Sequence, residues 1–100
     1  MLLSTCDQVV TIHGCGLKGS RLLVGGLDEV LKKRLHDAFM KVGLESELTG
    51  HSFPAAEPRN ICNMGATGAG VQLELTMTLR QSATQTDALA TIVRSVLVAA

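Results

Sequence analysis

The segment 71–79 alternates strictly between apolar and polar residues, and this alternation constrains the fold more than any other feature of the sequence. Successive side chains of a β-strand point to opposite faces, so a period of two predicts a strand with two unlike faces. One face is expected to lie in the core and consists of Val71, Leu73, Leu75, Met77 and Leu79. The other is expected to line a cleft and consists of Gln72, Glu74, Thr76, Thr78 and Arg80.

Three further strands are predicted. A β-branched run at 8–13 followed by glycines predicts a buried strand that ends in a glycine loop. Residues 21–24 predict a short strand, and residues 44–49 an exposed edge strand. The stretch 50–70 contains both prolines and no regular pattern, and a loop of this length in a compact domain usually carries function or wraps a site.

Two helices are predicted from apolar residues at three-and-four spacing. The first covers 27–42, with Val30 and Val42 on its apolar face and residues 32–34 facing solvent, and Gly43 ends it. The second is C-terminal and capped by Thr84 or Thr86. The predicted architecture is one α/β domain over residues 1–100, a small mixed or parallel sheet covered by two main helices.

Composition excludes several functional classes. Nine basic and nine acidic residues leave no net charge, and Trp and Tyr are absent, so nucleic-acid binding is not expected. No apolar run approaches the roughly 20 residues of a membrane span, and no basic residue precedes Lys18 as in a secretory signal. We therefore expect a cytoplasmic protein that does not bind membranes. Three cysteines without a CxxC pair predict buried thiols rather than a disulfide framework.

Two residues are candidates for chemistry. His13 stands at the C-terminal end of the first predicted strand, where α/β sheets bind ligands, and is a candidate metal ligand or acid–base group. The alternative is a hydrogen-bonded structural histidine. Glu74 lies mid-strand on the polar face, where a fixed carboxylate suits a general base. The alternative is a solvated strand residue.

Carboxylate recognition is the second candidate chemistry. Arg59, Asn60 and Asn63 occur together in the long loop, and Arg80 ends the last predicted strand. Guanidinium forks and amides suit the binding of carboxylates. The alternative for the two asparagines is that they satisfy backbone groups of the loop.

Five segments in the same order along the chain resemble the phage-type poly-γ-glutamate hydrolases: VTIHGC (10–15), VGGLD (24–28), PRNICN (58–63), GAGVQLEL (68–75) and LR (79–80). The NICN loop and the GVQLE strand are the most specific of these. That family is similar to the zinc carboxypeptidases, with an α/β/α fold. The resemblance implies a zinc-dependent hydrolase that cleaves γ-linked glutamyl amides.

The resemblance also implies residue roles. His13 looks like the last zinc ligand, and Glu74 looks like the carboxylate that activates the zinc-bound water. Arg59, Asn60, Asn63 and Arg80 are implied to hold carboxylates of a γ-glutamyl polymer or another carboxylate-rich ligand. The family takes its first two zinc ligands from an upstream segment resembling His-Gly-Gly-Gly-Ile-Glu, which does not occur in these 100 residues. The chain therefore resembles the C-terminal part of the fold.

Three functions remain open on this basis. The first is the zinc-dependent hydrolase. The second is a non-catalytic domain that recognises carboxylate-rich ligands. The third is a small structural domain that forms homo-oligomers through an exposed sheet edge beside the first strand.

Overall fold

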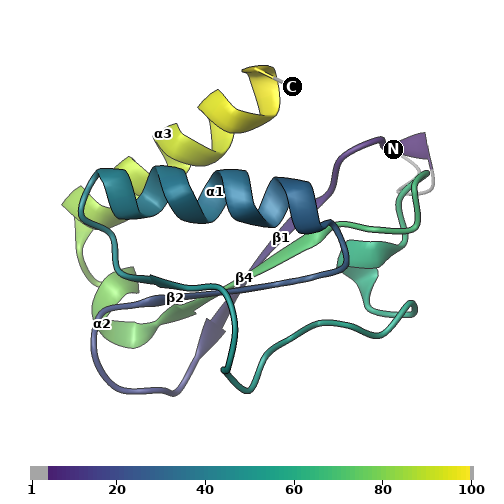
Figure 1. The fold of residues 1–100 in the computed structure, drawn as a ribbon. Coiled ribbons are helices and arrows are strands. Elements are labelled where there is room, and N and C mark those ends of the chain that lie inside the picture. The colour runs from purple at the N-terminus through teal and green to yellow at the C-terminus, as the bar shows by residue number, and fades with distance from the viewer. Residues whose placement is uncertain (1–4, 100) are drawn as a thin grey trace.

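The computed structural model describes residues 5–99. The chain runs through the following elements (Figure 1): β1 (Val10–Cys15), β2 (Leu22–Gly25), α1 (Glu29–Lys41), β3 (Ser46–Glu47), η2 (Ile61–Asn63), β4 (Val71–Thr76), α2 (Met77–Arg80) and α3 (Ala83–Ala99). Among the described residues, no helix is both long and apolar enough to cross a membrane.

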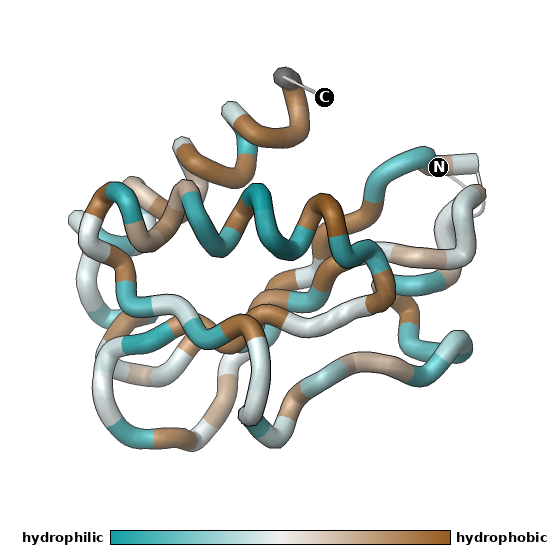
Figure 2. The backbone as a smooth tube through the Cα atoms, in the orientation of Figure 1, coloured by the Kyte–Doolittle hydropathy of each residue, from teal (hydrophilic) through white to brown (hydrophobic). Residues whose placement is uncertain are grey.

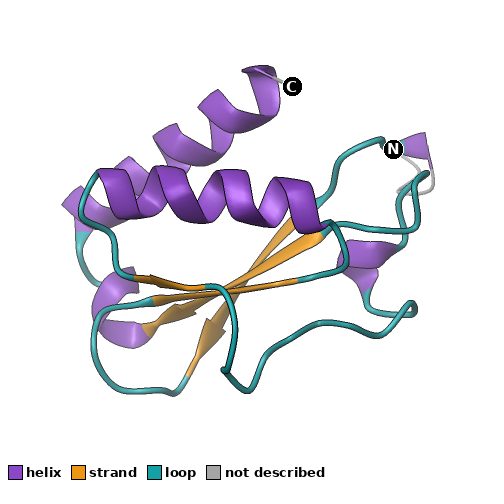
Figure 3. Ribbon diagram, viewed as in Figure 1, coloured by secondary structure: helices purple, strands orange, loops and turns teal. Residues whose placement is uncertain are grey.

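The four strands form one mixed sheet in the order β1-β4-β2-β3. Strand β4 is central, and it pairs parallel with β1 and antiparallel with β2. Strand β3 extends the sheet by pairing parallel with β2. Helices α1 and α3 lie over one face of the sheet, while the long loop before β4 crosses the other face (Figure 3). The predicted mixed α/β architecture is confirmed.

The core lies between the sheet and the helices. Its buried side chains come from β2, α1, β4 and α3, and include Leu22, Val24, Leu31, Leu35, Phe39, Leu73 and Leu89. Figure 2 shows the strands at the centre of the molecule and the end of α3 as largely hydrophobic. The core therefore fixes the backbone of β4, on which Glu74 is carried.

Helix α1 is shorter than predicted, and its buried stripe is narrower. Leu31, Leu35 and Phe39 are spaced four apart and face the sheet, whereas Val30 and Val42 are 72% and 53% exposed. The spacing rule placed both valines on the apolar face, but a stripe of one residue per turn leaves them beside it. Lys32, predicted to face solvent, is instead buried with 9% of its surface exposed. Asp28 caps the helix by accepting a hydrogen bond from the Leu31 N–H at 3.0 Å.

Strand β4 ends at Thr76, three residues earlier than predicted. Residues 77–80 form the short helix α2, which turns the chain back so that α3 can cover the sheet. Leu79 is buried as the alternation predicts, but Met77, which the alternation placed on the same face, is 56% exposed because residues two apart in a helix point to different sides. Pattern alone therefore did not separate the strand from the turn.

Two other boundaries also differ. Strand β1 covers 10–15 rather than 8–13, so His13 lies inside the strand instead of at its end. Helix α3 is capped by Ser82, whose Oγ accepts a hydrogen bond from the Gln85 N–H at 3.2 Å, rather than by Thr84 or Thr86. A serine hydroxyl satisfies an N-terminal N–H as well as a threonine does, and it stands one residue before the helix.

Candidate functional site

His13 and Glu74 meet across the β1–β4 pair. The two residues are partners in the parallel register, so their side chains point to the same face of the sheet. The Nδ1 atom of His13 and the Oε1 atom of Glu74 are 3.9 Å apart. The His13 side chain is 46% exposed and the Glu74 side chain 7%. The structure thus brings the two predicted chemical groups together, with the histidine toward solvent and the carboxylate beneath it.

A chain of two amides holds the carboxylate. The Gln72 amide donates from Nε2 to Oε1 of Glu74 at 3.2 Å. The Asn60 amide in turn donates from Nδ2 to Oε1 of Gln72 at 3.1 Å, and its own Oδ1 accepts from the Cys62 N–H at the start of η2. The long loop therefore fixes Glu74 through two amides. We call Asn60, Gln72 and Glu74 the amide tether.

The polar face of β4 is buried rather than open as a cleft. Gln72, Glu74 and Thr76 are 7%, 6% and 0% exposed. The alternation correctly separated the polar face from the apolar one, but it carried no information about what covers it. Gln72 was not singled out from the sequence, although its position two residues before Glu74 on the same face was the available signal.

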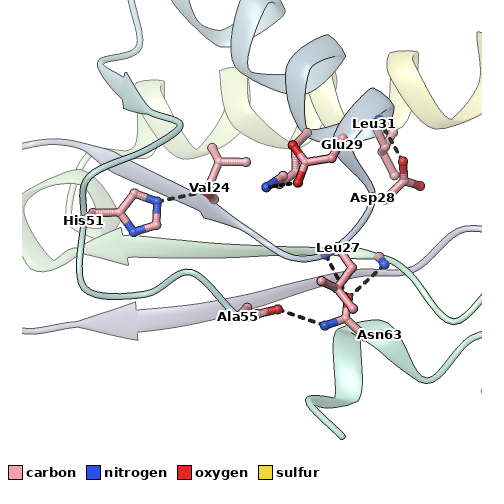
Figure 4. Close-up of polar contacts among 10 residues, drawn as sticks. Val24, Leu27, Asp28, Glu29, Leu31, His51, Ala55 and Asn63 are labelled. Carbon is pink, nitrogen blue, oxygen red and sulfur yellow. Dashed lines mark hydrogen bonds and ion pairs between the residues drawn. The ribbon is translucent and has the colours of Figure 1, made fainter. Parts of the chain in front are cut away.

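Asn63 organises the loop. Its Oδ1 accepts from the N–H groups of Leu27 and Gly70, at 3.1 and 3.0 Å, and its Nδ2 donates to the carbonyls of Ala55 and Glu57, at 2.8 and 3.0 Å. Figure 4 shows the contacts with Leu27 and Ala55. The residue is 2% exposed. Two acceptor and two donor positions are all an amide offers. Asn63 therefore has the backbone-satisfying role that was its alternative, and no position is left for a substrate carboxylate.

The two arginines occupy different places. Arg59 is exposed on the loop beside the amide tether. Arg80 donates from Nε to the Leu75 carbonyl at 3.2 Å, and a Cβ built on Gly14 would lie 2.7 Å from its Cζ. Consecutive strand residues face opposite ways, so the Arg80 guanidinium lies on the face of β1 opposite to His13. The structure does not bring Arg80 to the His13–Glu74 pair.

The other two histidines are held in structural contacts. His51 Nε2 donates to the Val24 carbonyl at 2.9 Å, and its Nδ1 accepts from the Phe53 N–H at 3.1 Å. Because a carbonyl only accepts and an N–H only donates, these partners assign the neutral Nε2–H tautomer. The Nδ1 atom of His36 lies 2.8 Å from the Ser46 hydroxyl.

The described residues do not by themselves fit a catalytic zinc ion. Within residues 5–99, no three His, Cys, Asp or Glu side chains gather closely enough to hold a metal. A catalytic zinc ion normally takes three protein ligands, and this face of the sheet offers His13 and Glu74. The expected zinc site is therefore incomplete in the part of the chain that the structure describes.

Two of the thiols are withdrawn from solvent. Cys15 and Cys62 are buried, as predicted from the sequence. Burial raises the pKa of the Cys62 thiol, and a backbone hydrogen bond offsets part of this effect. A thiol with a raised pKa stays protonated and unreactive at neutral pH.

Comparisons with known proteins agree with this fold. The model of the poly-gamma-glutamate hydrolase family matches residues 1–95. The chain belongs to this family. Among solved structures, a bacteriophage poly-gamma-glutamate hydrolase superposes with a TM-score of 0.88 at 26% identity, covering 96% of this chain and 54% of that one. The poly-gamma-glutamate hydrolase fold thus accounts for nearly all of the present chain.

Two curated relatives come from Bacillus subtilis (strain 168). UPF0714 protein YndL is 30% identical over 78 residues, which are 76% of this chain and 31% of YndL. The SPbeta prophage-derived UPF0714 protein YoqZ is 31% identical over 91 residues, 89% of this chain and 33% of YoqZ. A structure of zinc-free YndL superposes with a TM-score of 0.67 at 28% identity, covering 75% of this chain and 38% of that one. The chain spans about a third of the length of these curated relatives.

Proposed function

We propose that this chain carries the carboxylate of a hydrolase acting on γ-glutamyl amide bonds, with Glu74 as the group that accepts a proton from the attacking water. The observation that carries the proposal is the amide tether, which fixes Glu74 on the central strand directly beside the half-exposed His13. Membership of the poly-gamma-glutamate hydrolase family supports the substrate class.

The carboxylate has the properties that a general base needs. Among the described residues, the Gln72 amide is the one hydrogen-bond donor to Glu74, and it bonds Oε1. The second oxygen remains able to accept a proton. A base must be held within hydrogen-bond reach of the proton it removes, and the tether restricts the side chain to one orientation. Glu74 is thus positioned before substrate arrives.

His13 is proposed as the metal ligand of this site, and the structure of zinc-free YndL supports zinc as the metal of the family. His13 and Glu74 are too few to hold a catalytic zinc ion. Hydrolysis therefore depends on ligands that residues 5–99 do not supply. The part of the site that this chain supplies is the histidine and the carboxylate, held 3.9 Å apart on one face of the sheet.

Recognition of the polymer is assigned to the loop. Arg59 is exposed and follows the loop prolines, adjacent to Asn60 of the amide tether. Its guanidinium is free to pair with a carboxylate of a γ-glutamyl chain, which carries one per residue. Asn60 and Asn63 support this contact by fixing the backbone of the loop, and Arg80 acts on the other face of the sheet.

A second function is a carboxylate-binding domain without catalysis. It is favoured by one observation: the described residues retain the arginine-bearing loop but contain no group of three metal ligands. This domain would bind γ-glutamyl polymers and leave their length unchanged.

Polymer length and polymer binding separate the two functions. This chain, joined to a segment that supplies the zinc ligands missing from residues 5–99, is incubated with poly-γ-glutamate and Zn²⁺. The polymer is sized by gel filtration, and binding is measured by titration calorimetry. Shortening that disappears in Glu74→Gln and persists in Asp87→Asn supports the hydrolase, because Asp87 is an exposed residue of α3, which lies over the face of the sheet opposite to Glu74. Binding without shortening, lost in Arg59→Gln, supports the binding domain. If the polymer is neither bound nor shortened, both proposed functions are overturned.

A further inference from the structure

A small cavity lies at the edge of the sheet, between α1 and the segment that follows β3. It has a volume of about 230 Å³. Its wall includes apolar and neutral polar side chains and one cation: Val24, Lys32, Leu48, Thr49, His51 and Pro54. The cavity lies beyond β2, on the side away from β4, so it is separate from the His13–Glu74 pair. Among its lining residues there is no Asp or Glu.

Lys32 is the unusual member of this wall. Its side chain is 11% exposed, whereas that of Lys33, the next residue in the same helix, is 69% exposed. An ammonium group withdrawn from water needs compensation from hydrogen bonds and opposite charge. Lys32 Nζ is paired with Oε1 of Glu29 at 2.9 Å, but the Glu29 side chain is 79% exposed. A carboxylate that remains in water attracts a buried cation weakly.

The Lys32 ammonium group therefore has N–H donors available for a ligand. A lysine carries three N–H donors and no acceptor. Within residues 5–99, Glu29 is the one ion-pair partner of Lys32. His51 provides no acceptor for the rest, because both of its ring nitrogens are used by Val24 and Phe53. Figure 4 shows His51, Val24 and Glu29 together around this end of α1.

We infer that this cavity binds a small carboxylate, which takes the place of Glu29 on Lys32 Nζ while its hydrocarbon chain contacts Val24, Leu48 and Pro54. Lys32 presents a single ammonium point charge, which suits one carboxylate, and the cavity wall adds no guanidinium fork of the kind that binds phosphate bidentately. The apolar walls favour a short carbon chain over an inorganic anion. A glutamyl side chain has this chemistry, and in that choice of ligand the inference rests on the proposed function.

The competition with Glu29 gives the sharpest test. Glutarate, which has the carbon skeleton of a glutamyl side chain, is titrated into the folded chain and amide shifts of residues 49–51 are followed by NMR. Glu29→Gln removes the competing carboxylate at an exposed position, so glutarate is expected to bind about threefold tighter or more. Asp37→Asn is the matched control, since Asp37 pairs with the exposed Lys33. It is expected to leave the affinity unchanged.

Two lysine variants provide the complementary test. Lys32→Met should weaken glutarate binding at least about tenfold, as expected for loss of a charge-assisted hydrogen bond. Lys33→Met, on the same helix, should not. Unaltered or weaker binding in Glu29→Gln overturns the inference even where Lys32→Met does not fold. Inorganic phosphate that shifts the same amides as strongly as glutarate also overturns it, because it indicates unselective anion binding.

The inference and the proposed function fail separately. Glu74→Gln is expected to bind glutarate as the unaltered chain does, because Glu74 is on β4 and the cavity lies beyond β2. Loss of polymer cleavage with retained glutarate binding therefore leaves the cavity assignment intact. Retained cleavage with no glutarate binding overturns the cavity assignment alone.

Discussion

His13 and Glu74 are register partners on two parallel strands, and their side chains approach to 3.9 Å on the face of the sheet that the helices do not cover. His13 is half exposed and Glu74 is buried. A ligand can therefore reach the histidine, while the Gln72 amide holds the carboxylate. This arrangement depends on two parts of the chain far apart in sequence, the β1 strand and the loop that ends at β4.

The amide tether is expected to contribute to stability. Gln72→Leu leaves Glu74 Oε1 and the Asn60 amide without their partner in a buried region, which costs about 1–3 kcal/mol in unfolding free energy. Urea denaturation measures this. Gln81→Leu, at an exposed position after α2, is the control and should change the value by less than about 0.5 kcal/mol. Equal effects of the two substitutions would argue against the tether.

Asn63 is expected to be more important for the loop than Asn60. Asn63→Ala removes four hydrogen bonds and leaves the Leu27 and Gly70 N–H groups without an acceptor. The unfolding free energy is therefore expected to fall by about 3 kcal/mol or more. Asn60→Ala removes two, and half that loss or less is expected. Denaturation of both variants under the same conditions gives the order. The reverse order contradicts the assignment of Asn63 as the centre of the loop.

The unfolding free energy is expected to depend on pH through the Cys62 thiol. Its pKa is raised by burial, so the folded state favours the protonated thiol. The corresponding stability is complete below the pKa of the unfolded thiol and is lost as the pH rises through the folded pKa. The unfolding free energy of the unaltered chain should therefore fall in alkaline solution, and Cys62→Ala should flatten that fall. A slope that is the same in both chains would exclude Cys62 as its source.

Self-association through the outer edge of β1 remains a prediction. Strand β1 is the first in the sheet order, and Ile12, on this strand, is 54% exposed. Unpaired strand edges with apolar side chains favour edge-to-edge pairing. Sedimentation velocity is expected to show oligomers that Ile12→Lys dissociates, while Val30→Lys, at a valine of α1 that is 72% exposed, leaves them intact. A monomer at all concentrations would refute the prediction.

The sequence predicted where most strands and helices lie, but it did not predict which side chains other segments bury. Hydrophobic period and glycine positions located β2, β4 and α1, because local geometry sets the period of the side chains. The same pattern could not show that the polar face of β4 is buried or that Gln72 bonds the loop, since that contact joins residues 60 and 72 through tertiary packing. The burial of Lys32 was missed for the same reason: it depends on where the segment after β3 passes.

The candidate site was predicted in part. His13 and Glu74 were chosen as a strand-borne histidine and a strand-borne carboxylate, and they lie side by side. Asn63 and Arg80 were chosen by residue type, but residue type does not determine which partners a side chain finds. Asn63 is fully hydrogen-bonded to backbone groups of the loop and of Leu27, and Arg80 donates to backbone carbonyls on the other face.

The role proposed for Glu74 is tested by the initial rate of γ-glutamyl bond cleavage. The rate is measured with Zn²⁺ present on this chain joined to a segment that supplies the zinc ligands missing from residues 5–99, with Glu74 unaltered, Glu74→Gln or Asp87→Asn. Removal of a general base is expected to lower kcat about 10²–10⁴-fold in Glu74→Gln, while Asp87→Asn, at an exposed position on α3, keeps the full rate. A Glu74→Gln protein that cleaves the polymer as fast as the unaltered one would show that Glu74 is not the base.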